Sequence, residues 1–353
     1  HPSPFSGGVF LAMEQRSDWL TPVLYTGAVL GGATFAAIAA RHFLRVSRAR
    51  SQLQALLNSA AGTEARVVIT GASGGIGREL AQQLLRHPSV HVLLACRDQK
   101  KTHKIFRSDR VKVHRLDLMD PDSVQAFADE AHSFLAAGND GLRMLVNNAG
   151  VMRPPAAMSK GVDCTWQTNF LGPFLLTELL GRFRQQHQSL PVRVVHVSSR
   201  LEKRSELNEQ LLESVGKGEV GEHAYSDSKR ALMLWTSVRA QSLAFKGGLF
   251  CHCVTPGMVD TDLGRHFMSP WLWPLTKPLR MVLLRSPAEG ALSVIAGALK
   301  PQATSCFGRY MDGETQLEDL VIERMGDKQL ALSLVKWATK TTALEQRADG
   351  YDR

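Results

Sequence analysis

The chain has 353 residues, of which 44% are apolar and 21% charged, and this is typical of a globular protein with one large α/β domain and additional segments. The formal net charge of +9 comes from scattered basic residues without an interleaved aromatic run, which argues against a nucleic-acid-binding surface. The five cysteines lack the spacing of a disulfide framework, and no metal site is predicted because the Cys251–Cys253 pair has no further ligands at suitable spacing.

The amino-terminal region contains an uncharged run over residues 19–40. A helix of this length spans the roughly 30 Å of hydrocarbon in a bilayer. Four arginines follow the run directly: Arg41, Arg45, Arg48 and Arg50. The positive-inside rule therefore predicts a single-pass transmembrane anchor with the main domain in the cytosol. A secretory signal peptide would have its positive charges before the run, whereas a buried core helix stays open as an alternative.

The segments on either side of the predicted anchor carry little information. We expect residues 1–18 to be a tail, in which Met13 is a candidate initiator and residues 1–12 a candidate upstream extension. Residues 41–62 are expected to form a polar, partly helical linker.

After this linker, short apolar runs alternate with amphipathic stretches. The apolar runs are rich in β-branched residues and span 66–70, 90–95, 111–116, 143–148, 192–198 and 249–255. The amphipathic stretches between them include 76–87, 121–136, 170–187 and 224–245. This alternation predicts a doubly wound α/β domain around a parallel sheet. We assign residues 63–313 to that domain, with a further edge strand over 308–312, and residues 314–353 to a C-terminal helical extension.

The first predicted strand runs directly into a glycine-rich turn, TGASGGIG, at residues 70–77. Gly71 permits the tight turn, Gly75 lets the backbone approach a pyrophosphate, and Gly77 lets the next helix pack closely on the sheet. The amino terminus of that helix presents unpaired N–H groups to phosphates. A glycine cluster between the first strand and the first helix of an α/β unit therefore predicts a dinucleotide site.

The end of the second predicted strand favours NADP(H) over NAD(H). A site for NAD(H) usually has a carboxylate here that binds the ribose 2′-hydroxyl, whereas this chain has neutral Cys96 followed by Arg97. A guanidinium suits a 2′-phosphate, and Ser73 and Arg78 are candidates for further polar contacts. Asp98 lies one position further on and keeps NAD(H) open, and Arg97 is also compatible with a solvated loop.

Tyr225 and Lys229 lie four positions apart in AYSDSKRAL. Residues at this spacing share a helix face, so the phenol and the ammonium are expected to point the same way. A nearby cation lowers the pKa of a phenol and makes tyrosine a usable proton donor near neutral pH. The pattern is common by chance, and an exposed helix face is the alternative when the two residues are taken alone.

Seven short motifs stand in one order and together resemble the short-chain dehydrogenase/reductase family. They are TGASGGIG (70–77), LDL (116–118), NNAG (147–150), TNFLG (168–172), VSS (197–199), YSDSK (225–229) and TPGMVDT (255–261). The resemblance covers residues 64–312 and implies the Rossmann fold. The anchor, LACR and the long separation of Ser199 from Tyr225 are most similar to membrane-bound retinol dehydrogenase-like members, and we expect the segment between these two residues to be an extended loop.

The resemblance implies four catalytic residues. Tyr225 would exchange a proton with the substrate oxygen, Lys229 would hold the nicotinamide ribose and lower the tyrosine pKa, and Ser199 would polarise the carbonyl. Asn169 is similar to the asparagine that positions a water in a proton relay. Donors must converge on the oxygen where charge develops during hydride transfer. Taken singly, Ser199 is also compatible with a simple strand end, and Asn169 with a cap of a helix that starts at Phe170.

The resemblance also implies coenzyme contacts, with Asn147 near the ribose and Asp117 near the adenine. Thr261 and the backbone of Val259 would lie near the pyrophosphate and the carboxamide. The complete predicted set is Gly71, Ser73, Gly75, Ile76, Gly77, Arg97, Asp117, Asn147, Ala149, Gly150, Tyr225, Lys229, Pro256, Gly257, Val259 and Thr261.

Residues 263–285 are rich in Trp, Leu and Met and lie where this family covers its substrate. Apolar bulk beside basic residues suits a lid that rests on a bilayer. Core packing or a contact between copies of the chain is the alternative, so a homo-oligomer stays open.

The preferred hypothesis is an NADP(H)-dependent oxidoreductase that interconverts a lipophilic alcohol and its carbonyl, such as a retinoid, a steroid or a lipid aldehyde. We expect it on the cytosolic face of an endomembrane, first of all the endoplasmic reticulum, with lipid-droplet and mitochondrial membranes as alternatives. A catalytically silent, cofactor-binding scaffold of the same fold is the second hypothesis, against which the intact Ser199, Tyr225 and Lys229 set argues. A nucleotide-sugar epimerase relative would share Y-x-x-x-K but usually has a different glycine spacing.

Overall fold

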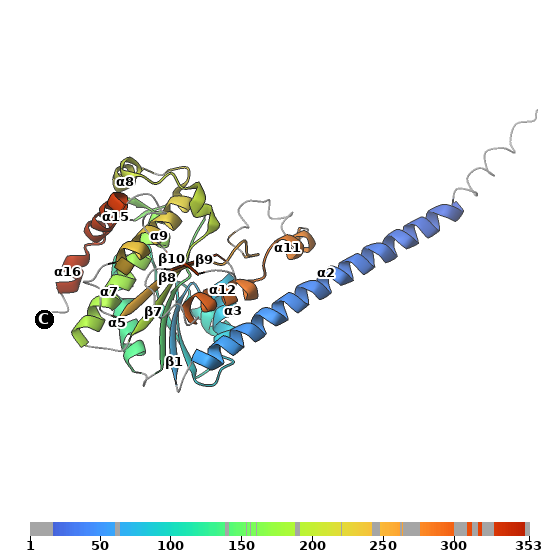
Figure 1. The fold of residues 1–353 in the computed structure, drawn as a ribbon, viewed down its shortest axis with the longest axis horizontal. Coiled ribbons are helices and arrows are strands. Elements are labelled where there is room, and N and C mark those ends of the chain that lie inside the picture. The colour runs from blue at the N-terminus through green and yellow to red at the C-terminus, as the bar shows by residue number, and fades with distance from the viewer. Residues whose placement is uncertain are drawn as a thin grey trace, which may run out of the picture.

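A twisted sheet with helices on both faces forms the body of the protein, and one long helix, α2, projects from it (Figure 1). The computed structural model describes residues 17–60, 64–137, 141–152, 154–155, 157–159, 161–187, 191–219, 221–241, 248–261, 263, 276–299, 309–312, 317–319 and 328–349. Most of the predicted lid, residues 264–275, lies outside the described residues.

The main sheet has the strand order β10-β9-β8-β7-β4-β1-β2-β3. Its strands are β1 (Ala65–Thr70), β2 (Val90–Cys96), β3 (Val111–Arg115), β4 (Leu142–Asn147), β7 (Val192–Val197), β8 (Leu249–Thr255), β9 (Arg309–Asp312) and β10 (Leu317–Asp319). All neighbours are parallel except β9 and β10. The strand order reverses at β1, which pairs with both β2 and β4, so the predicted parallel α/β sheet is confirmed.

The six predicted apolar runs all form strands, and every observed bound lies within one residue of the expected one. The run over 308–312 yields β9, but β10 pairs with it on the outer side, so β9 is not the edge strand that the sequence suggested. A separate small sheet consists of β5 (Met158–Ser159) and β6 (Val162–Asp163).

Helices cover both faces of the sheet. They are α3 (Gly75–Leu84), α4 (Gln99–Ile105), α5 (Pro121–Ala136), α6 (Cys164–Trp166), α7 (Gly172–His187), α8 (Glu209–Gly216), α9 (Ala224–Gln241), α11 (Lys277–Leu283), α12 (Pro287–Leu299), α15 (Lys328–Thr341) and α16 (Leu344–Asp349). The core consists of two hydrophobic clusters, and alternate residues of a strand point into different ones. In β1, Val67 and Ile69 pack into one cluster and Val68 into the other, so both faces of the sheet need a layer of helices. The first cluster contains Leu80 of α3 and the second contains Phe127 of α5.

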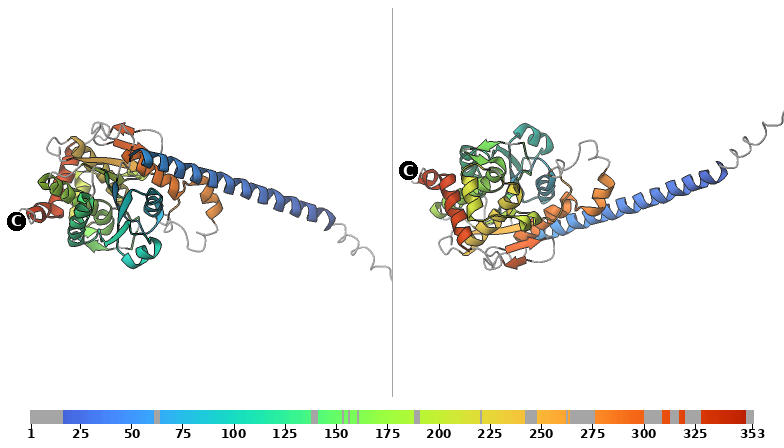
Figure 2. Two further views of the ribbon diagram at one scale, coloured as in Figure 1. Left: turned by 90° about the horizontal axis from the view of Figure 1, so that it is seen from below. Right: turned by 90° about the horizontal axis from the view of Figure 1, so that it is seen from above.

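Helix α2 runs without a break over Ser17–Ala60, so residues 41–60 differ from the linker that the sequence suggested. Ala49, Leu53 and Leu57 are buried at four-residue spacing and pack in the core cluster of α3 and α12. Figure 2 shows in both views that this end of α2 lies along the domain and that the other end extends away from it. Residues 41–60 therefore belong to the folded domain.

No helix in the described parts of the chain combines the length and the hydropathy needed to cross a bilayer. The anchor predicted over residues 19–40 lies within α2 and stays a prediction.

The described C-terminal residues form two helices, α15 and α16, that pack on the domain. Leu330, Leu334 and Ala338 of α15 are buried at helical spacing in the core cluster that contains Val68 and Phe127. The ring of Trp337 stacks on that of Phe170, with 6.4 Å between the ring centroids. The helix α15 thereby supports the segment that carries Asn169.

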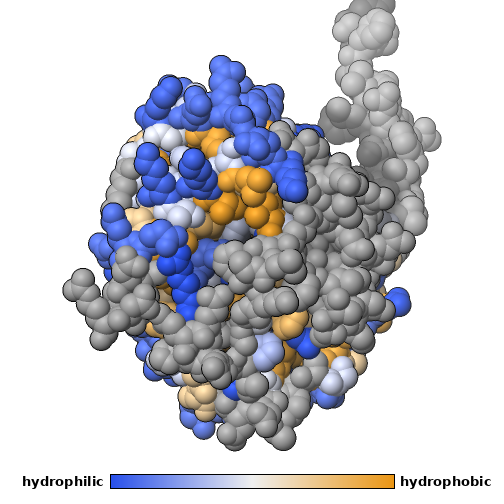
Figure 3. Space-filling view, turned by 60° about the vertical axis from the view of Figure 1, so that its left-hand side comes forward, coloured by the Kyte–Doolittle hydropathy of each residue, from blue (hydrophilic) through white to orange (hydrophobic). Residues whose placement is uncertain are grey.

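Exposed apolar side chains concentrate on two helices. Seen with the side of α15 and α16 turned forward, the described surface is largely hydrophilic, with apolar residues in small areas between (Figure 3). Among the residues that the structure describes, most of the exposed large apolar ones belong to α2 and to α11, which contacts it. They are Phe35, Phe43 and Leu44 on α2, and Leu279, Val282 and Leu283 on α11.

Candidate active site

The glycine-rich turn after β1 leaves no room for side chains at two of its glycines. Gly71 has a φ of +70°, and a Cβ there would lie 2.8 Å from Cα of Ala149. A Cβ on Gly77 would lie 2.5 Å from Nδ2 of Asn148. By contrast, a Cβ on Gly74 would meet nothing within 4 Å. The turn is thus packed tightly against the loop after β4 and open on its other side, which fits a bound pyrophosphate at the start of α3.

Thr70 and Asn148 hold the turn in this form. The hydroxyl of Thr70 accepts hydrogen bonds from the backbone N–H groups of Asn148 and Ala149, each at 3.0 Å. The amide of Asn148 donates to the carbonyl of Thr70 at 2.9 Å and to that of Gly71 at 3.2 Å. The sequence reasoning missed both residues, although each lies inside a motif that it used.

Asn147 ends β4, but its side chain turns into the core, and its predicted ribose contact stays a prediction. Its side chain is buried and donates to the hydroxyl of Thr177 at 3.0 Å and to Nδ1 of His196 at 3.1 Å. Burial lowers the pKa of His196 to about 3, so the imidazole is neutral and can accept. As the last residue of β4, Asn147 points to the face covered by α7, where it links β4, β7 and α7.

Most of the other predicted coenzyme residues follow the carboxyl ends of strands, at one edge of the sheet. They are Gly71, Ser73, Gly75, Ile76 and Gly77 after β1, Arg97 after β2, Asp117 after β3, Ala149 and Gly150 after β4, and Pro256, Gly257, Val259 and Thr261 after β8. The loops after β1 and β8 meet, because a Cβ on Gly75 would lie 3.2 Å from Cγ2 of Thr261. Open α/β sheets bind their ligands at this edge, beside the strand where the order reverses.

The charged residues after β2 and β3 differ in whether they form hydrogen bonds within the protein. Arg97 is exposed, and Asp98 caps α4 by accepting from the backbone N–H of Lys101 at 2.9 Å. Asp117 accepts from the backbone N–H of Met119 at 3.1 Å, which orders the turn after β3. The guanidinium is therefore more available to a ligand than the neighbouring carboxylate.

Ser199, Tyr225 and Lys229 come together from two elements. Ser199 follows β7, and the other two lie in the first turns of α9. The hydroxyls of Ser199 and Tyr225 are hydrogen-bonded to each other. The ammonium of Lys229 lies 5.8 Å from the ring centroid of Tyr225 and donates to the carbonyl of Val197 at 2.8 Å. Two hydroxyls and one cation thus lie beside each other at the coenzyme edge.

Burial shifts the pKa values of both titratable groups. It raises the pKa of Tyr225, and the hydrogen bond with Ser199 acts in the opposite direction. It lowers the pKa of Lys229 to about 8, so the amine is mostly protonated at neutral pH. The net shift of the Tyr225 pKa is upward because burial is its main cause, and the lowering of this pKa by Lys229 stays a prediction.

Asn169 lies in a π-helical turn, Gln167–Leu171, directly before α7, and is fully buried. Its amide donates to the carbonyl of Val151 at 2.9 Å and its oxygen accepts from the N–H of Val151 at 2.8 Å. A Cβ on Gly150 would lie 3.3 Å from Oδ1 of Asn169 and 3.4 Å from Nζ of Lys229. The asparagine is therefore next to the lysine, and π-turns within helices are frequent at functional sites.

The segment between Ser199 and Tyr225 is not the extended loop that the sequence suggested, because it contains a 3₁₀-helix, Arg200–Arg204, and α8. Asn208 caps α8 by accepting from the backbone N–H of Leu211 at 2.9 Å. Helix α8 packs against α15 and β6. This folded segment starts and ends at two of the candidate catalytic residues.

Asp227 ties this segment to α9. Its carboxylate is buried and accepts from the hydroxyl of Ser205 at 2.8 Å and from the N–H of Glu206 at 2.9 Å. The residue lies between Tyr225 and Lys229, and its contacts hold the chain that leaves Ser199. The sequence reasoning passed over it, although a carboxylate inside YSDSK was visible.

We expect Asp227→Ala to lower both turnover and stability, because it leaves the hydroxyl of Ser205 and the N–H of Glu206, in the segment after Ser199, without their acceptor. Hydrogen bonds to a charged group contribute about 1.5–3 kcal/mol each, so the loss of both should lower the free energy of unfolding by about 3–6 kcal/mol. Urea unfolding and steady-state turnover measure the two effects. Asp122→Ala, which removes an exposed carboxylate paired with Arg347, is the control; an equally small effect of both variants would contradict the role of Asp227.

The comparisons with known proteins agree on one family. The sequence model described as short chain dehydrogenase matches residues 65–270. The chain is 37% identical over 255 residues to retinol dehydrogenase 12 of Bos taurus, covering 69% of this chain and 76% of that protein. It is 33% identical over 326 residues to retinol dehydrogenase 14 of Mus musculus, covering 87% and 93%. A crystal structure of an uncharacterized protein from Mycobacterium paratuberculosis matches with a TM-score of 0.60 at 28% identity, covering 80% of this chain and 95% of that one.

Proposed function

The chain belongs to the short-chain dehydrogenase/reductase family, as an oxidoreductase with retinol dehydrogenase homologues, and on this premise we propose that it interconverts a lipophilic alcohol and its carbonyl with NADP(H). The observation that carries the proposal is the contact of the Ser199 and Tyr225 hydroxyls beside the ammonium of Lys229. The fold of this family binds nicotinamide coenzymes, and the open side of the turn at Gly74 fits one.

The bound coenzyme would supply or accept a hydride at the substrate carbon. In the direction of reduction, the hydroxyl of Ser199 donates a hydrogen bond to the carbonyl oxygen, and Tyr225 donates its proton to the same oxygen. The raised pKa of Tyr225 keeps the phenol protonated before this step. The cation of Lys229, beside the ring of Tyr225, would stabilise the phenolate that results and would also hold the nicotinamide ribose. In the reverse direction the phenolate takes up the proton of the alcohol.

The neighbourhood of the catalytic residues supports the same roles. Asn169 would hold a water for proton return, and its contacts to Val151 fix its orientation. Gly150 brings the backbone close to Asn169 and Lys229. Together with the Ser199, Tyr225 and Lys229 set, the nearby Asn169 favours an active enzyme over a catalytically silent scaffold of the same fold.

We propose NADP(H) over NAD(H) because of the charge at the end of β2. Arg97 is exposed there, and Arg78 is exposed on α3. Asp98, the carboxylate that could bind a ribose 2′-hydroxyl, is already used as the cap of α4. A guanidinium pairs well with a 2′-phosphate, and a capping carboxylate is a poor partner for a 2′-hydroxyl.

The substrate class and the membrane association are proposed from apolar surface and from the relatives. Exposed apolar side chains of α2 and α11 lie together, and α11 is the described end of the predicted lid over 263–285. Such a surface beside basic residues suits contact with a bilayer, from which a lipophilic substrate would enter. We therefore propose a single-pass anchor over 19–40 on an endomembrane, preferably the endoplasmic reticulum, with the catalytic domain in the cytosol.

A panel of lipophilic carbonyls tests this function directly. The full chain in detergent is given retinal, a ketosteroid or a long-chain aldehyde, each with NADPH or NADH, and coenzyme oxidation is followed. We expect turnover of at least one of these carbonyls, with a higher kcat/KM for NADPH than for NADH. Oxidation of neither coenzyme with any of them would contradict the proposal, and a preference for NADH would contradict the assignment of Arg97.

A further inference from the structure

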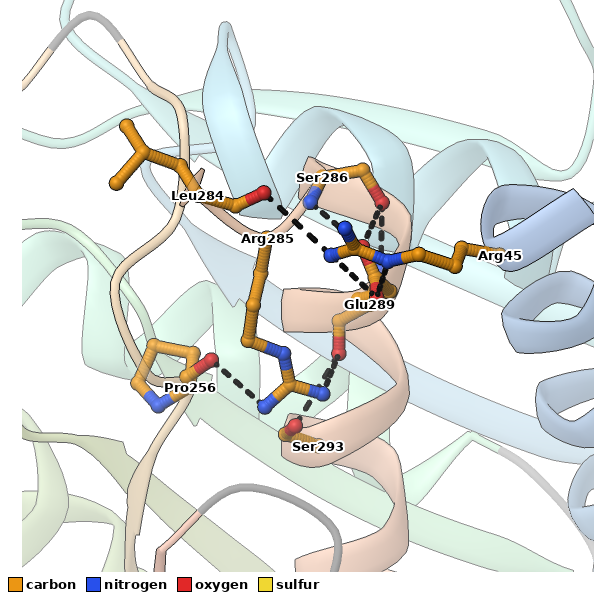
Figure 4. Close-up of polar contacts among 7 residues, drawn as sticks. All are labelled: Arg45, Pro256, Leu284, Arg285, Ser286, Glu289 and Ser293. Carbon is orange, nitrogen blue, oxygen red and sulfur yellow. Dashed lines mark hydrogen bonds and ion pairs between the residues drawn. The ribbon is translucent and has the colours of Figure 1, made fainter. Parts of the chain in front are cut away.

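An ion pair joins α2 to the amino terminus of α12, across 244 positions of sequence. The guanidinium of Arg45 donates from Nε to Oε1 of Glu289 at 2.9 Å and from Nη2 to Oε2 at 3.0 Å, in a two-point contact (Figure 4). The same Nη2 reaches the carbonyl of Leu284 at 3.4 Å. The side chain of Glu289 is only 10% exposed, so this pair is more shielded from water than an ordinary surface pair.

Glu289 also closes the start of α12. Its Oε2 accepts from the backbone N–H of Ser286 at 2.8 Å and from the hydroxyl at 2.9 Å, while that hydroxyl accepts from the N–H of Glu289 at 3.2 Å. This is the reciprocal arrangement known as a capping box. One carboxylate thus receives both the guanidinium from α2 and the donors that begin α12, and its position depends on both.

Arg285, the residue before this cap, holds the loop after β8 from both sides. Its guanidinium donates to the carbonyl of Pro256 at 3.1 Å (Figure 4). Its backbone N–H donates to the carbonyl of Met258 at 2.8 Å, and its carbonyl accepts from the N–H of Asp260, also at 2.8 Å. Gly257 has a φ of +80°, and a Cβ there would lie 2.9 Å from Cδ of Arg285. The side chain of Arg285 contacts Pro256 and Gly257, and its backbone pairs with Met258 and Asp260, so one residue contacts the loop along most of its length.

The same loop is packed between α12 and α3. A Cβ on Gly290 would lie 3.0 Å from Cγ1 of Ile76 and 3.1 Å from Cγ2 of Val259. The first residues of α12 thus touch both the loop after β8 and the first turn of α3. Any displacement of the start of α12 would reach both of these proposed coenzyme-binding segments.

We propose that Arg45, Glu289 and Arg285 are positioning residues for the coenzyme loop 256–261, so that the docked part of α2 helps to shape the coenzyme site. The contacts run from Arg45 to Glu289, to the cap of α12, to Arg285 and to the loop. The proposal rests on the proposed function, because it takes this loop to bind the nicotinamide end of the coenzyme.

A second ion pair of α2 provides a matched control. Arg50 binds Glu79 of α3 at 2.8 and 3.2 Å, again in a two-point contact. This pair also fastens α2 to the domain, but neither of its residues contacts the loop 256–261 in the described structure. If the ion pairs only attach α2 to the domain, Arg50→Ala and Arg45→Ala should change the loop 256–261 and the coenzyme affinity to the same extent. If Arg45 positions the loop, only Arg45→Ala should change them.

The experiment compares the full-length wild type with Arg45→Ala, Arg45→Lys, Glu289→Gln and Arg50→Ala. Hydrogen exchange of the peptide that covers 256–261 is measured without coenzyme, and the Kd of NADPH and the kcat are measured on the same preparations. We expect faster exchange in Arg45→Ala and Glu289→Gln, and a Kd about two- to thirtyfold above that of the wild type, the range of coupling through neighbouring residues. Arg45→Lys should recover part of the affinity, and Arg50→Ala should leave loop exchange and Kd unchanged.

Two results would overturn the inference. One is loop exchange and NADPH affinity in Arg45→Ala that match those of Arg50→Ala, with the wild type binding the coenzyme normally. The other is faster exchange without any change in Kd, which would separate the loop from coenzyme binding. A wild type that binds neither NADPH nor NADH would instead refute the proposed function, and with it the coenzyme role of the loop.

Discussion

Replacement of Tyr225 by phenylalanine is expected to lower kcat by about 10²- to 10⁴-fold, the usual contribution of a positioned acid or base. The variant retains the ring beside Lys229 and loses only the hydroxyl that bonds to Ser199. Because the coenzyme should contact Lys229 and the glycine-rich turn more than the phenol oxygen, its Kd should stay at the wild-type value. Steady-state turnover and calorimetric titration with NADPH measure the two quantities.

Ser199→Ala provides the comparison for this variant. It removes the donor to the carbonyl oxygen but leaves the proton of Tyr225 in place, so its loss of kcat should be smaller than that of Tyr225→Phe. Wild-type turnover in Tyr225→Phe would refute the proposed acid/base role. A loss of NADPH binding equal to the loss of turnover would show that the phenol acts in binding and not in chemistry.

The second large effect is expected for Gly71→Ala in the turn after β1. The φ of +70° costs an L-residue about 1–2 kcal/mol, and the new Cβ would lie 2.8 Å from Cα of Ala149, where overpacking costs roughly 1–3 kcal/mol. We therefore expect the free energy of unfolding to fall by about 2 kcal/mol or more. Urea unfolding followed by far-ultraviolet circular dichroism measures it.

Gly74→Ala is the control in the same turn. Gly74 has a φ of −165°, which any residue adopts, and a Cβ there would meet nothing within 4 Å. Its unfolding free energy should stay within about 0.5 kcal/mol of the wild type, as for an ordinary exposed substitution. Equal stabilities of the Gly71→Ala and Gly74→Ala variants would contradict the tight packing of this turn.

Local pattern was sufficient to predict the sheet and the edge at which the site lies. Strands such as 249–255 are continuous apolar runs because helices cover both faces, and that signal does not depend on distant residues. The glycine-rich turn follows the first strand, and Ser199 and Tyr225 flank one long segment. Since the carboxyl ends of parallel strands share one edge of the sheet, the positions of the motifs were enough to predict that these residues lie near each other.

The errors and omissions came from features that depend on the direction of a side chain or on distant contacts. Asn147 and Asn148 are adjacent in one motif. Because β4 ends at Asn147, the side chain of Asn147 points into the core and that of Asn148 points at the glycine-rich turn, which the motif alone does not indicate. The pairing of Arg45 with Glu289 joins parts of the chain that no local pattern connects. The polar stretch 41–60 looked like a linker because its buried residues are few and widely spaced.

Helix α8, by contrast, could have been predicted, because the sequence contains the features of a helix start and of helical spacing. Asn208 is a good N-cap, Glu209 follows it, and Leu212 and Val215 recur at helical spacing. The sequence reasoning noted only the unusual length of the segment. The upward shift of the Tyr225 pKa, by contrast, could not be predicted, because it depends on how deeply the phenol is buried beside Lys229.

The most direct test of the account follows a deuterium label. Reduction of an accepted lipophilic carbonyl with NADPH that carries deuterium at the transferable position of C4 is analysed by mass spectrometry of the alcohol, for the wild type and for Tyr225→Phe. The account predicts one deuterium on the carbinol carbon in the wild type and, in equal time, little or no labelled alcohol with the variant, although the variant still binds NADPH. Unlabelled alcohol from the wild type, or equal labelled product from both proteins, would contradict it.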